Sequence, residues 1–512
     1  MGSISLLLTL LFTLVGVGVL ANKTHQLNRN DFPRDFVFGA GASAYQVEGA
    51  AAEDGRSPSI WDTFTHAGKM LDNSTADVSA DQYHKYKEDV KLMHDMGLDA
   101  YRFSISWSRL IPGGRGAVNP KGLEYYNNLI NELLKYGIQP HVTLHHLDLP
   151  QVLEDEYGGW LSERIVRDFT MYADVCFREF GDRVTYWSTL NEPNVFSMGA
   201  YDKGVLPPLH CSSPYGFRNC SVGNSSTEPY IVTHNQLIAH ASVVKLYKKK
   251  YKSQQQGQIG MTILAYWFVP NTNSREDIAA TQRALDFLHG WFLNPLVFGD
   301  YPDTMKENVG PRLPSFTKCE SALVKGSFDY IGINHYVAIS ISDDKQSARK
   351  DTRDYMEDMS ALFVSNGTPS ASGPPLIFPN TPWGMQGVLE YIKTNYGNPP
   401  VFVHENGYVM YTRELNDIER VNYLNGYLEY LLKAVRNGSN AKGYFIWSFV
   451  DVFELLFGYK GTYGLYEVDF NDKDRPRRAR LSAHWYSNFL KKKSNLYIEE
   501  PTVSSKSHSA ND

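Results

Sequence analysis

TYWSTLNEPN, residues 185–194, joins a short apolar run to an amide, a carboxylic acid and a proline. The run Thr185–Leu190 predicts a β-strand, and Asn191, Glu192 and Pro193 follow it directly. If the strand belongs to a barrel of parallel strands, Glu192 lies at the C-terminal mouth, where such folds build their active sites.

The rest of the chain repeats this pattern of short apolar runs that alternate with longer helical segments. Segments 79–96, 121–136 and 162–180 carry apolar residues at helical spacing. Eight such units predict an α/β fold, a single-domain (β/α)₈ TIM barrel over residues 22–512. An open doubly wound sheet is the alternative, although no Gly-rich phosphate loop follows the first run. The expected strands are Phe36–Ala40, Ala100–Ile105, Pro140–Leu144, Thr185–Leu190, Ile259–Ile263, Tyr330–Ile333, Val401–Val403 and Gly443–Trp447.

A second acid follows another of these runs, because Val401–Val403 leads into His404 and Glu405. Strand ends of one barrel face a common mouth, so Glu192 and Glu405 can meet although they are far apart in sequence. Cleavage of a glycosidic bond needs such a pair, one acid to protonate the leaving oxygen and one carboxylate to attack or to activate water. A single acid at a strand end more often forms a cap or a salt bridge, so the interpretation depends on the pair.

The motifs around these two acids are similar to those of a known family. Asn191-Glu192-Pro193 and Glu405-Asn406-Gly407 closely resemble the signatures of glycoside hydrolase family one, the plant β-glucosidase family. The resemblance extends from about Phe32 to Leu490 and includes the blocks Phe38–Gly49, Tyr101–Trp107 and Ser482–Tyr486. It implies a retaining β-glucosidase that hydrolyses β-D-glucosides of small plant metabolites through a covalent glucosyl-enzyme intermediate.

The resemblance also implies roles for single residues. Glu192 matches the acid/base and Glu405 the nucleophile, held about 5 Å apart as in retaining enzymes. The charge of Glu405 is then expected to raise the pKa of Glu192. Positions that match supports of the nucleophile are Arg102, Asn334 and Tyr336. Positions that match the glucose-binding residues are Gln46, His146, Asn191, Tyr336, Trp447 and Glu454. No metal and no organic cofactor is implied.

The sequence departs from the family pattern at three positions. His404 replaces a threonine, and we expect its side chain to face the helices, because strand neighbours point to opposite faces and Glu405 faces the mouth. Leu147 and Leu455 replace tryptophans. The second of these normally donates a hydrogen bond to the sugar, and its loss should cost about 0.5–1.5 kcal/mol.

These departures leave the reaction open between hydrolysis and transfer. They resemble a plant subgroup that includes transglucosidases, which move glucose from acyl-glucose esters to flavonoid, anthocyanin or other phenolic acceptors. The covalent intermediate is shared, and only the second nucleophile differs. A catalytically inactive sugar-binding protein is a third interpretation, which the presence of both Glu192 and Glu405 disfavours.

The N-terminal segment 1–21 predicts a cleaved signal peptide, because Ile4–Leu20 is almost unbroken apolar sequence and Ala21 follows it. A membrane anchor is the alternative, since a run of this length lies at the lower limit for a spanning helix. After cleavage we expect no membrane segment and an extracellular or vacuolar location. Asn-x-Ser/Thr glycosylation sites agree with this route and occur at Asn22, Asn73, Asn219, Asn224, Asn366 and Asn437.

Cysteine spacing and charge complete the expectations. Cys211 and Cys220 lie close together in a Pro/Gly/Ser-rich segment and are expected to form a disulfide, whereas Cys176 and Cys319 are expected to be unpaired. The formal net charge of −6 lacks the basic footprint of a nucleic-acid partner, which leaves a small glucoside or glucose ester as the expected partner. The irregular stretches 203–228 and 340–382 are expected to form walls of a substrate cleft.

Overall fold

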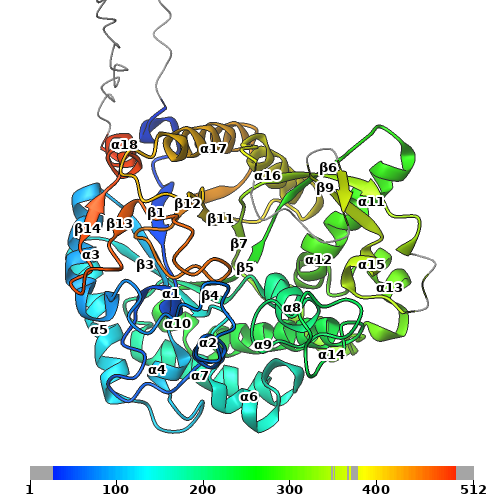
Figure 1. Ribbon diagram of the computed structural model, residues 1–512, viewed down its shortest axis with the longest axis horizontal. Coiled ribbons are helices and arrows are strands. Elements are labelled where there is room, and N and C mark those ends of the chain that lie inside the picture. Colours follow the sequence, from blue (N-terminus) through cyan, green and yellow to red (C-terminus); the bar gives the residue numbers. More distant parts are fainter. Residues whose placement is uncertain (1–26, 348–349, 351, 366–367, 371–378, 492–512) are drawn as a thin grey trace, which may run out of the picture.

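The computed structural model describes all residues except 1–26, 348–349, 351, 366–367, 371–378 and 492–512. Within this part, eight parallel strands close into a barrel in the order β1-β12-β11-β7-β5-β4-β3-β2, as Figure 1 shows. All eight expected strands are present, so the barrel prediction is confirmed. The barrel strands are β1 (Val37–Gly41), β2 (Ala100–Ser104), β3 (Gln139–His145), β4 (Tyr186–Asn191), β5 (Gln258–Leu264), β7 (Tyr330–Asn334), β11 (Val401–Asn406) and β12 (Ala441–Trp447).

Helices surround the barrel because each buries one apolar stripe against it. In α5, Tyr126, Leu129 and Leu133 are at most 1% exposed, and Asn119 caps the first turn by accepting a hydrogen bond from the Lys121 N–H. The longer helices are α3 (Gln82–Met96), α5 (Pro120–Lys135), α7 (Arg164–Phe180), α9 (Glu228–Lys250), α11 (Arg275–Leu285), α16 (Trp383–Asn395), α17 (Ile418–Arg436) and α18 (Leu481–Leu490). Shorter helices include α1 (Ala44–Val47), α6 (Gln151–Tyr157), α8 (Pro193–Tyr201), α12 (Trp291–Phe298) and α15 (Tyr355–Met359).

Segments that follow β5 and β7 build a second sheet beside the barrel. Its strands β6 (Trp267–Pro270), β8 (Ala338–Asp343), β9 (Ala361–Ser365) and β10 (Thr368–Ser370) pair in the order β10-β9-β8-β6 and lie at the right of Figure 1. The sequence suggested that the stretch 340–382 is irregular. The structure shows instead that it contains strands of this sheet and the helix α15. Antiparallel pairing of β8 with β9 buries Ile341 and Phe363 and gives this wall of the mouth a regular framework.

The barrel interior is filled by large rings for which glycines on neighbouring strands make room. Tyr330, Phe402 and Phe445 form a buried cluster inside the strands. A Cβ atom on Gly39 would lie 2.5 Å from the Phe445 ring and 2.6 Å from the Ala100 carbonyl oxygen. Gly39 is therefore required for close packing.

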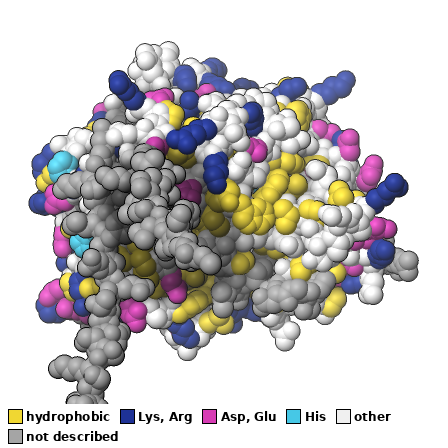
Figure 2. Space-filling view, turned by 90° about the horizontal axis from the view of Figure 1, so that it is seen from above, with side chains coloured by type: hydrophobic (Ala, Val, Ile, Leu, Met, Phe, Trp, Pro, Cys, Tyr) yellow, Lys and Arg dark blue, Asp and Glu magenta, His cyan; other side chains and the backbone are white. Residues whose placement is uncertain are grey.

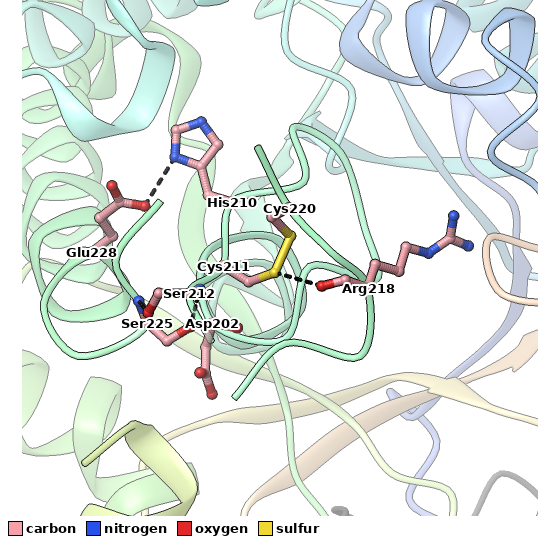
Figure 3. The surroundings of a disulfide bond; sticks show 8 residues. All are labelled: Asp202, His210, Cys211, Ser212, Arg218, Cys220, Ser225 and Glu228. Carbon is pink, nitrogen blue, oxygen red and sulfur yellow. Dashed lines mark hydrogen bonds and ion pairs between the residues drawn. A yellow bond between two sulfur atoms is a disulfide. The ribbon is translucent and has the colours of Figure 1, made fainter. Parts of the chain in front are cut away.

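The expected disulfide is present, and Figure 3 shows its surroundings. Cys211 and Cys220 are bonded, whereas Cys176 is buried and Cys319 exposed, both unpaired, as predicted. The bond lies against the backbone of Gly204, where a Cβ would meet the Cys220 sulfur at 2.4 Å. The long loop after α8 is thus held against the end of that helix.

The surface carries charges of both signs. On the face in Figure 2, basic and acidic side chains lie among patches of hydrophobic ones. None of the helices in the described ranges combines the length and the apolar character that crossing a membrane requires. The expected signal peptide and the sites Asn22 and Asn366 lie outside the described residues.

We expect Gly39→Ala to destabilise the protein by about 1–3 kcal/mol, because the added methyl group overpacks the barrel interior. Urea unfolding followed by tryptophan fluorescence measures this change. Gly41→Ala on the same strand is the matched control, since the nearest atoms to a Cβ there lie at 3.4 Å or more. Equal losses in the two variants would contradict the packing argument.

Candidate active site

Glu192 is delivered to the barrel mouth by a strained turn between β4 and α8. It is the N-cap of α8 with φ 46° and ψ 50°, a left-handed conformation that costs a residue with a side chain about 1–3 kcal/mol. Its N–H donates to the Thr262 carbonyl across the neighbouring strand (2.8 Å), and Pro193 occupies the first helical position. The side chain is half-buried, and the Asn334 amide donates to its Oε1 (2.9 Å). The surrounding barrel therefore fixes the direction of this carboxyl.

Glu405 lies near the end of β11, and hydrogen bonds occupy both of its carboxylate oxygens. Arg102 Nη1 lies 2.5 Å from Oε1, and the Tyr336 hydroxyl donates to Oε2 over 2.8 Å. The side chains of Arg102 and Glu405 are 1% and 5% exposed, so this ion pair is buried. The arrangement holds the Glu405 carboxyl in one orientation, ion-paired with Arg102.

His404 lies inside the barrel, so the expectation that it faces the helices is wrong. Its Nδ1 is 2.8 Å from the Thr262 hydroxyl, and its ring stacks on Phe402. A register shift on β11 between Val403 and Glu405 marks a β-bulge, and a bulge breaks the alternation on which the expectation rested. His404 and Glu405 therefore both point inward. Burial, and next the charge of Arg102, lowers the pKa of His404 well below its usual value, so the ring is neutral.

A hydrogen-bond network connects the supports of the two acids. Arg102 Nη2 donates to the side-chain oxygen of Asn191 (2.6 Å), which also accepts from the Asn334 amide (3.0 Å). The Asn191 amide group lies 3.1 Å from His146 Nε2. His146 in turn stacks on Trp447, with ring centroids 5.8 Å apart and planes at 16°. One network thus spans the barrel from β2 to β12.

The polar end of the site also contains Gln46 and Glu454. The Gln46 amide donates to the Phe453 carbonyl (2.8 Å) and its oxygen accepts from Ser43, so its orientation is fixed. Glu454 is buried, which raises the pKa of its carboxyl, and its Oε1 has no hydrogen-bond partner among the described residues. A buried acid of this kind is suited to a hydroxyl-bearing ligand.

A cavity of about 690 Å³ brings most of these side chains together. Polar residues that line one part are Gln46, His146, Glu192, Tyr336, Glu405, Trp447 and Glu454. Apolar residues that line the rest include Leu147, Val195, Met198, Leu206, Phe268, Met356, Met359, Phe363 and Leu455. Arg102, Asn191 and Asn334 do not line the cavity but contact side chains that do. The cavity therefore has a polar end and a longer apolar part.

The two acids differ in their electrostatic environments. Burial, and next the charge of Glu405, raises the pKa of Glu192 to about 8, against the opposing effects of Asn334 and Arg102. Glu192 is thus protonated at neutral pH, whereas Glu405 is ion-paired with Arg102. Two carboxyls whose environments separate their protonation states are suited to act as a general acid and a nucleophile.

The stretches 203–228 and 340–382 line the cavity, as the sequence predicted. The first contributes Lys203, Val205, Leu206 and Phe217, and the second Tyr355, Met356, Met359 and Phe363. Sequence reasoning did not identify the part of this apolar wall that α8 contributes. Val195, Met198 and Gly199 line it from α8, and Met356 and Met359 from α15. The spacing of Val195 and Met198 from Glu192 follows one helix face, so the α8 part could have been found from periodicity. The α15 part lies within the expected stretch 340–382, although the sequence did not predict the helix or the second sheet beside it.

Comparisons with known proteins agree with this geometry. The family model described as "Glycosyl hydrolase family 1" matches residues 28–495. "Beta-glucosidase 22" of Oryza sativa subsp. japonica is 58% identical over 493 residues, which are 95% of this chain and 92% of that protein. "Cyanidin 3-O-glucoside 7-O-glucosyltransferase (acyl-glucose)" of Delphinium grandiflorum is 55% identical over 96% of each chain. A rice Os3BGlu6 β-glucosidase structure has a TM-score of 0.87 at 45% identity, covering 91% of this chain and 99% of that one.

We expect the substitution Glu405→Gln to lower the pKa of Glu192 from its value of about 8, because it removes the neighbouring negative charge. Infrared difference spectroscopy with isotope-labelled glutamate measures the titration without requiring turnover. The pKa should stay above that of an exposed glutamate, since burial is the larger cause. An unchanged pKa in the variant would contradict the coupling between the two carboxyls.

Proposed function

The chain belongs to glycosyl hydrolase family 1, and from that premise we propose that it is a retaining β-glucosidase acting on β-D-glucosides of small plant metabolites. The observation that carries this proposal is the pair Glu192 and Glu405 in one cavity, the first protonated and the second ion-paired. The interpretation as an inactive sugar-binding protein is disfavoured, because both acids and the residues that support them are in place.

In the proposed first step, Glu405 attacks the anomeric carbon and Glu192 donates its proton to the glycosidic oxygen. The aglycone leaves as an alcohol, and a glucosyl ester forms on Glu405. The ester carries no negative charge, so the pKa of Glu192 falls and its carboxylate can act as a base. Glu192 then takes a proton from water, which attacks the anomeric carbon and releases glucose and the free Glu405 carboxylate.

We assign the glucose-binding role to the polar end of the cavity. The side chains at this end are Gln46, His146, Trp447 and Glu454. Hydrogen bonds fix the orientation of Gln46, whereas His146 Nδ1 and Glu454 Oε1 have no hydrogen-bond partner among the described residues. The amide of Asn191, which does not line the cavity, lies against His146 Nε2. Leu455 lines the same cavity but offers no N–H donor. The sugar therefore has one hydrogen bond fewer than in relatives that carry tryptophan at this position.

Transfer of glucose from an acyl-glucose ester to a phenolic acceptor is the second candidate function. The 55% identity with the Delphinium grandiflorum glucosyltransferase supports it, and so does the apolar part of the cavity, where an aromatic acceptor could bind. The glucosyl ester on Glu405 would form in the same way, and the acceptor hydroxyl would replace water. Glu192 would then take the proton from that hydroxyl.

We also propose that residues 1–21 form a signal peptide and that the protein follows the secretory pathway to the cell exterior or the vacuole. Four of the expected glycosylation sites, Asn73, Asn219, Asn224 and Asn437, are exposed on the surface. Exposure is what attachment of a glycan to these side chains requires. The disulfide between Cys211 and Cys220 agrees with an oxidising compartment.

Hydrolysis should depend on the protonated form of Glu192. We expect kcat/KM for an aryl β-glucoside to fall as pH rises through about 8, because the acid form exists only below the raised pKa. Glu192→Gln should remove this alkaline limb and slow cleavage of a poor leaving group by about 10²–10⁴-fold, with a smaller effect on a dinitrophenyl leaving group.

The matched control is Glu154→Gln. Burial also raises the pKa of this carboxyl, to about 7, but Glu154 does not line the cavity, so the alkaline limb should persist. If both variants lost the fall of kcat/KM at alkaline pH, that fall would not be caused by deprotonation of Glu192.

One reaction mixture separates the two candidate functions. The purified protein is incubated with an aryl β-glucoside or an acyl-glucose ester, with and without a phenolic acceptor, and all products are followed. Free glucose at the same rate with and without acceptor is expected for a hydrolase. A glucosylated acceptor formed at the expense of glucose would favour the transferase instead, and no product from either donor would contradict both.

A further inference from the structure

The loop that the disulfide closes brings an aromatic ring to the mouth of the cavity. Residues 211–220, which we call the stapled loop, run from Cys211 to Cys220, and Phe217 of this loop lines the cavity. Phe217 is also 58% exposed. A side chain that lines a cavity and is at the same time largely open to solvent lies at the rim of the opening, where an entering ligand can contact it.

The position of this exposed ring distinguishes it from other apolar side chains on the surface. Single exposed apolar side chains are common on proteins and need no explanation. Among the exposed large apolar side chains of the described residues, however, only Phe217 and Leu456 line the cavity. Phe217 is the aromatic one of the two. Its ring therefore adds to the apolar wall that Val195 and Met198 form on α8.

The ring is held in place by its own backbone and by a cation. The Phe217 N–H donates to the Lys203 carbonyl (2.9 Å), and the Lys203 ammonium lies 5.9 Å from the centre of the Phe217 ring. This distance is within the range of about 6 Å for a cation–π contact. The residue before it is Gly216, where a Cβ would lie 2.2 Å from the Cys211 sulfur, so the chain passes directly over the disulfide.

The stapled loop is also attached to the rest of the protein on both sides of the ring. On one side, the Tyr215 hydroxyl donates to the Thr352 carbonyl (2.7 Å), in the segment that leads to α15. On the other side, the Arg218 guanidinium lies 5.6 Å from the centre of the Phe64 ring on α2 (Ile60–His66). The rim is thus fixed before a ligand binds, and less conformational entropy is lost on binding.

The size and lining of the cavity restrict the aglycone. The volume of about 690 Å³ lies within the range of about 300–1,000 Å³ that buries a drug-sized ligand, so a glucoside with an extended aglycone fits. The side chains of Val195, Met198 and Leu456 offer no N–H or O–H donor and no oxygen acceptor. A second sugar along this wall would leave hydroxyl groups without partners, whereas a planar apolar ring would not.

We propose that Phe217 is a specificity-determining residue whose ring stacks on the outer aromatic ring of the aglycone. This inference rests on the proposed function and specifies its substrate class: β-glucosides of planar aromatic aglycones with two or more rings. The ring that carries the glycosidic oxygen lies inside the cavity, close to Glu192, so the ring that reaches the rim is a second one. Oligosaccharides and glucosides with a short aglycone do not make this contact.

Biphenyl-4-yl and 4-cyclohexylphenyl β-glucosides test the proposal, because their outer rings are similar in size but only the first is planar and aromatic. The measured quantity is the ratio of kcat/KM for the biphenyl substrate to kcat/KM for the cyclohexyl substrate. We expect Phe217→Leu, which keeps an apolar side chain but removes the ring, to lower this ratio by about two- to tenfold. The amount of active protein cancels within each variant, and the difference between the leaving groups cancels between variants.

Two further variants separate the ring from the loop that carries it. Phe217→Trp keeps an aromatic face and should keep the wild-type ratio. Val222→Ala is the matched control, because Val222 follows the stapled loop closely and is 54% exposed but does not line the cavity. An unchanged ratio in Phe217→Leu, or an equal fall in either of the other variants, would overturn the proposal.

If Phe217→Leu does not fold, competitive inhibition of the wild type by the two corresponding thioglucosides supplies the comparison. The biphenyl compound should inhibit more strongly, and equal inhibition constants overturn the proposal. Phenyl β-glucoside tests the proposed function separately. Its cleavage together with a ratio that does not respond to Phe217→Leu, or without cleavage of either two-ring substrate, refutes only the present inference, whereas no cleavage of any of the three glucosides refutes the proposed function.

Discussion

The buried ion pair between Arg102 and Glu405 is the interaction on which the rest of the site depends. Removing two charges from water is expensive, and the pair is maintained only where further hydrogen bonds satisfy both partners. Tyr336 supplies one to Glu405 and Asn191 another to Arg102. Asn191 and Asn334 then extend the network to His146 and Glu192. The network thus fixes the geometry of Glu405, whose charge raises the pKa of Glu192, whereas the charge of Arg102 opposes that shift.

The barrel supports this pair through packing below the mouth. Tyr330, Phe402 and Phe445 fill the interior, and small neighbours such as Gly39 accept their rings. The bulge in β11 turns two successive side chains inward, so that Glu405 reaches the mouth while His404 bonds to Thr262 beneath it. A neutral His404 adds no charge near Glu405, so this departure from the family pattern leaves the ion pair with Arg102 in place.

Chemistry and substrate choice belong to different parts of one cavity. The strand ends and the loops next to them supply the polar lining of the cavity, whereas α8, α15 and the second sheet supply the apolar wall. Helix α8 joins the two parts, because Glu192 is its N-cap and Val195, Met198 and Gly199 on the same helix line the apolar wall. Variation in the loops around the mouth can therefore change the aglycone without disturbing the ion pair at the barrel axis.

The sequence by itself determined the barrel, its eight strands, the disulfide partners and the two acids, because these depend on local periodicity, on short spacing or on motifs within single strand ends. It did not determine the direction of His404, since a bulge is a property of the pairing between strands and not of one strand. The second sheet was also missed, because its strands pair across segments distant in sequence. The way in which α8, α15 and the stapled loop meet around one cavity was decided only by tertiary structure. Whether a buried polar group is satisfied depends on every neighbour in space, and the order of residues along the chain does not specify those neighbours.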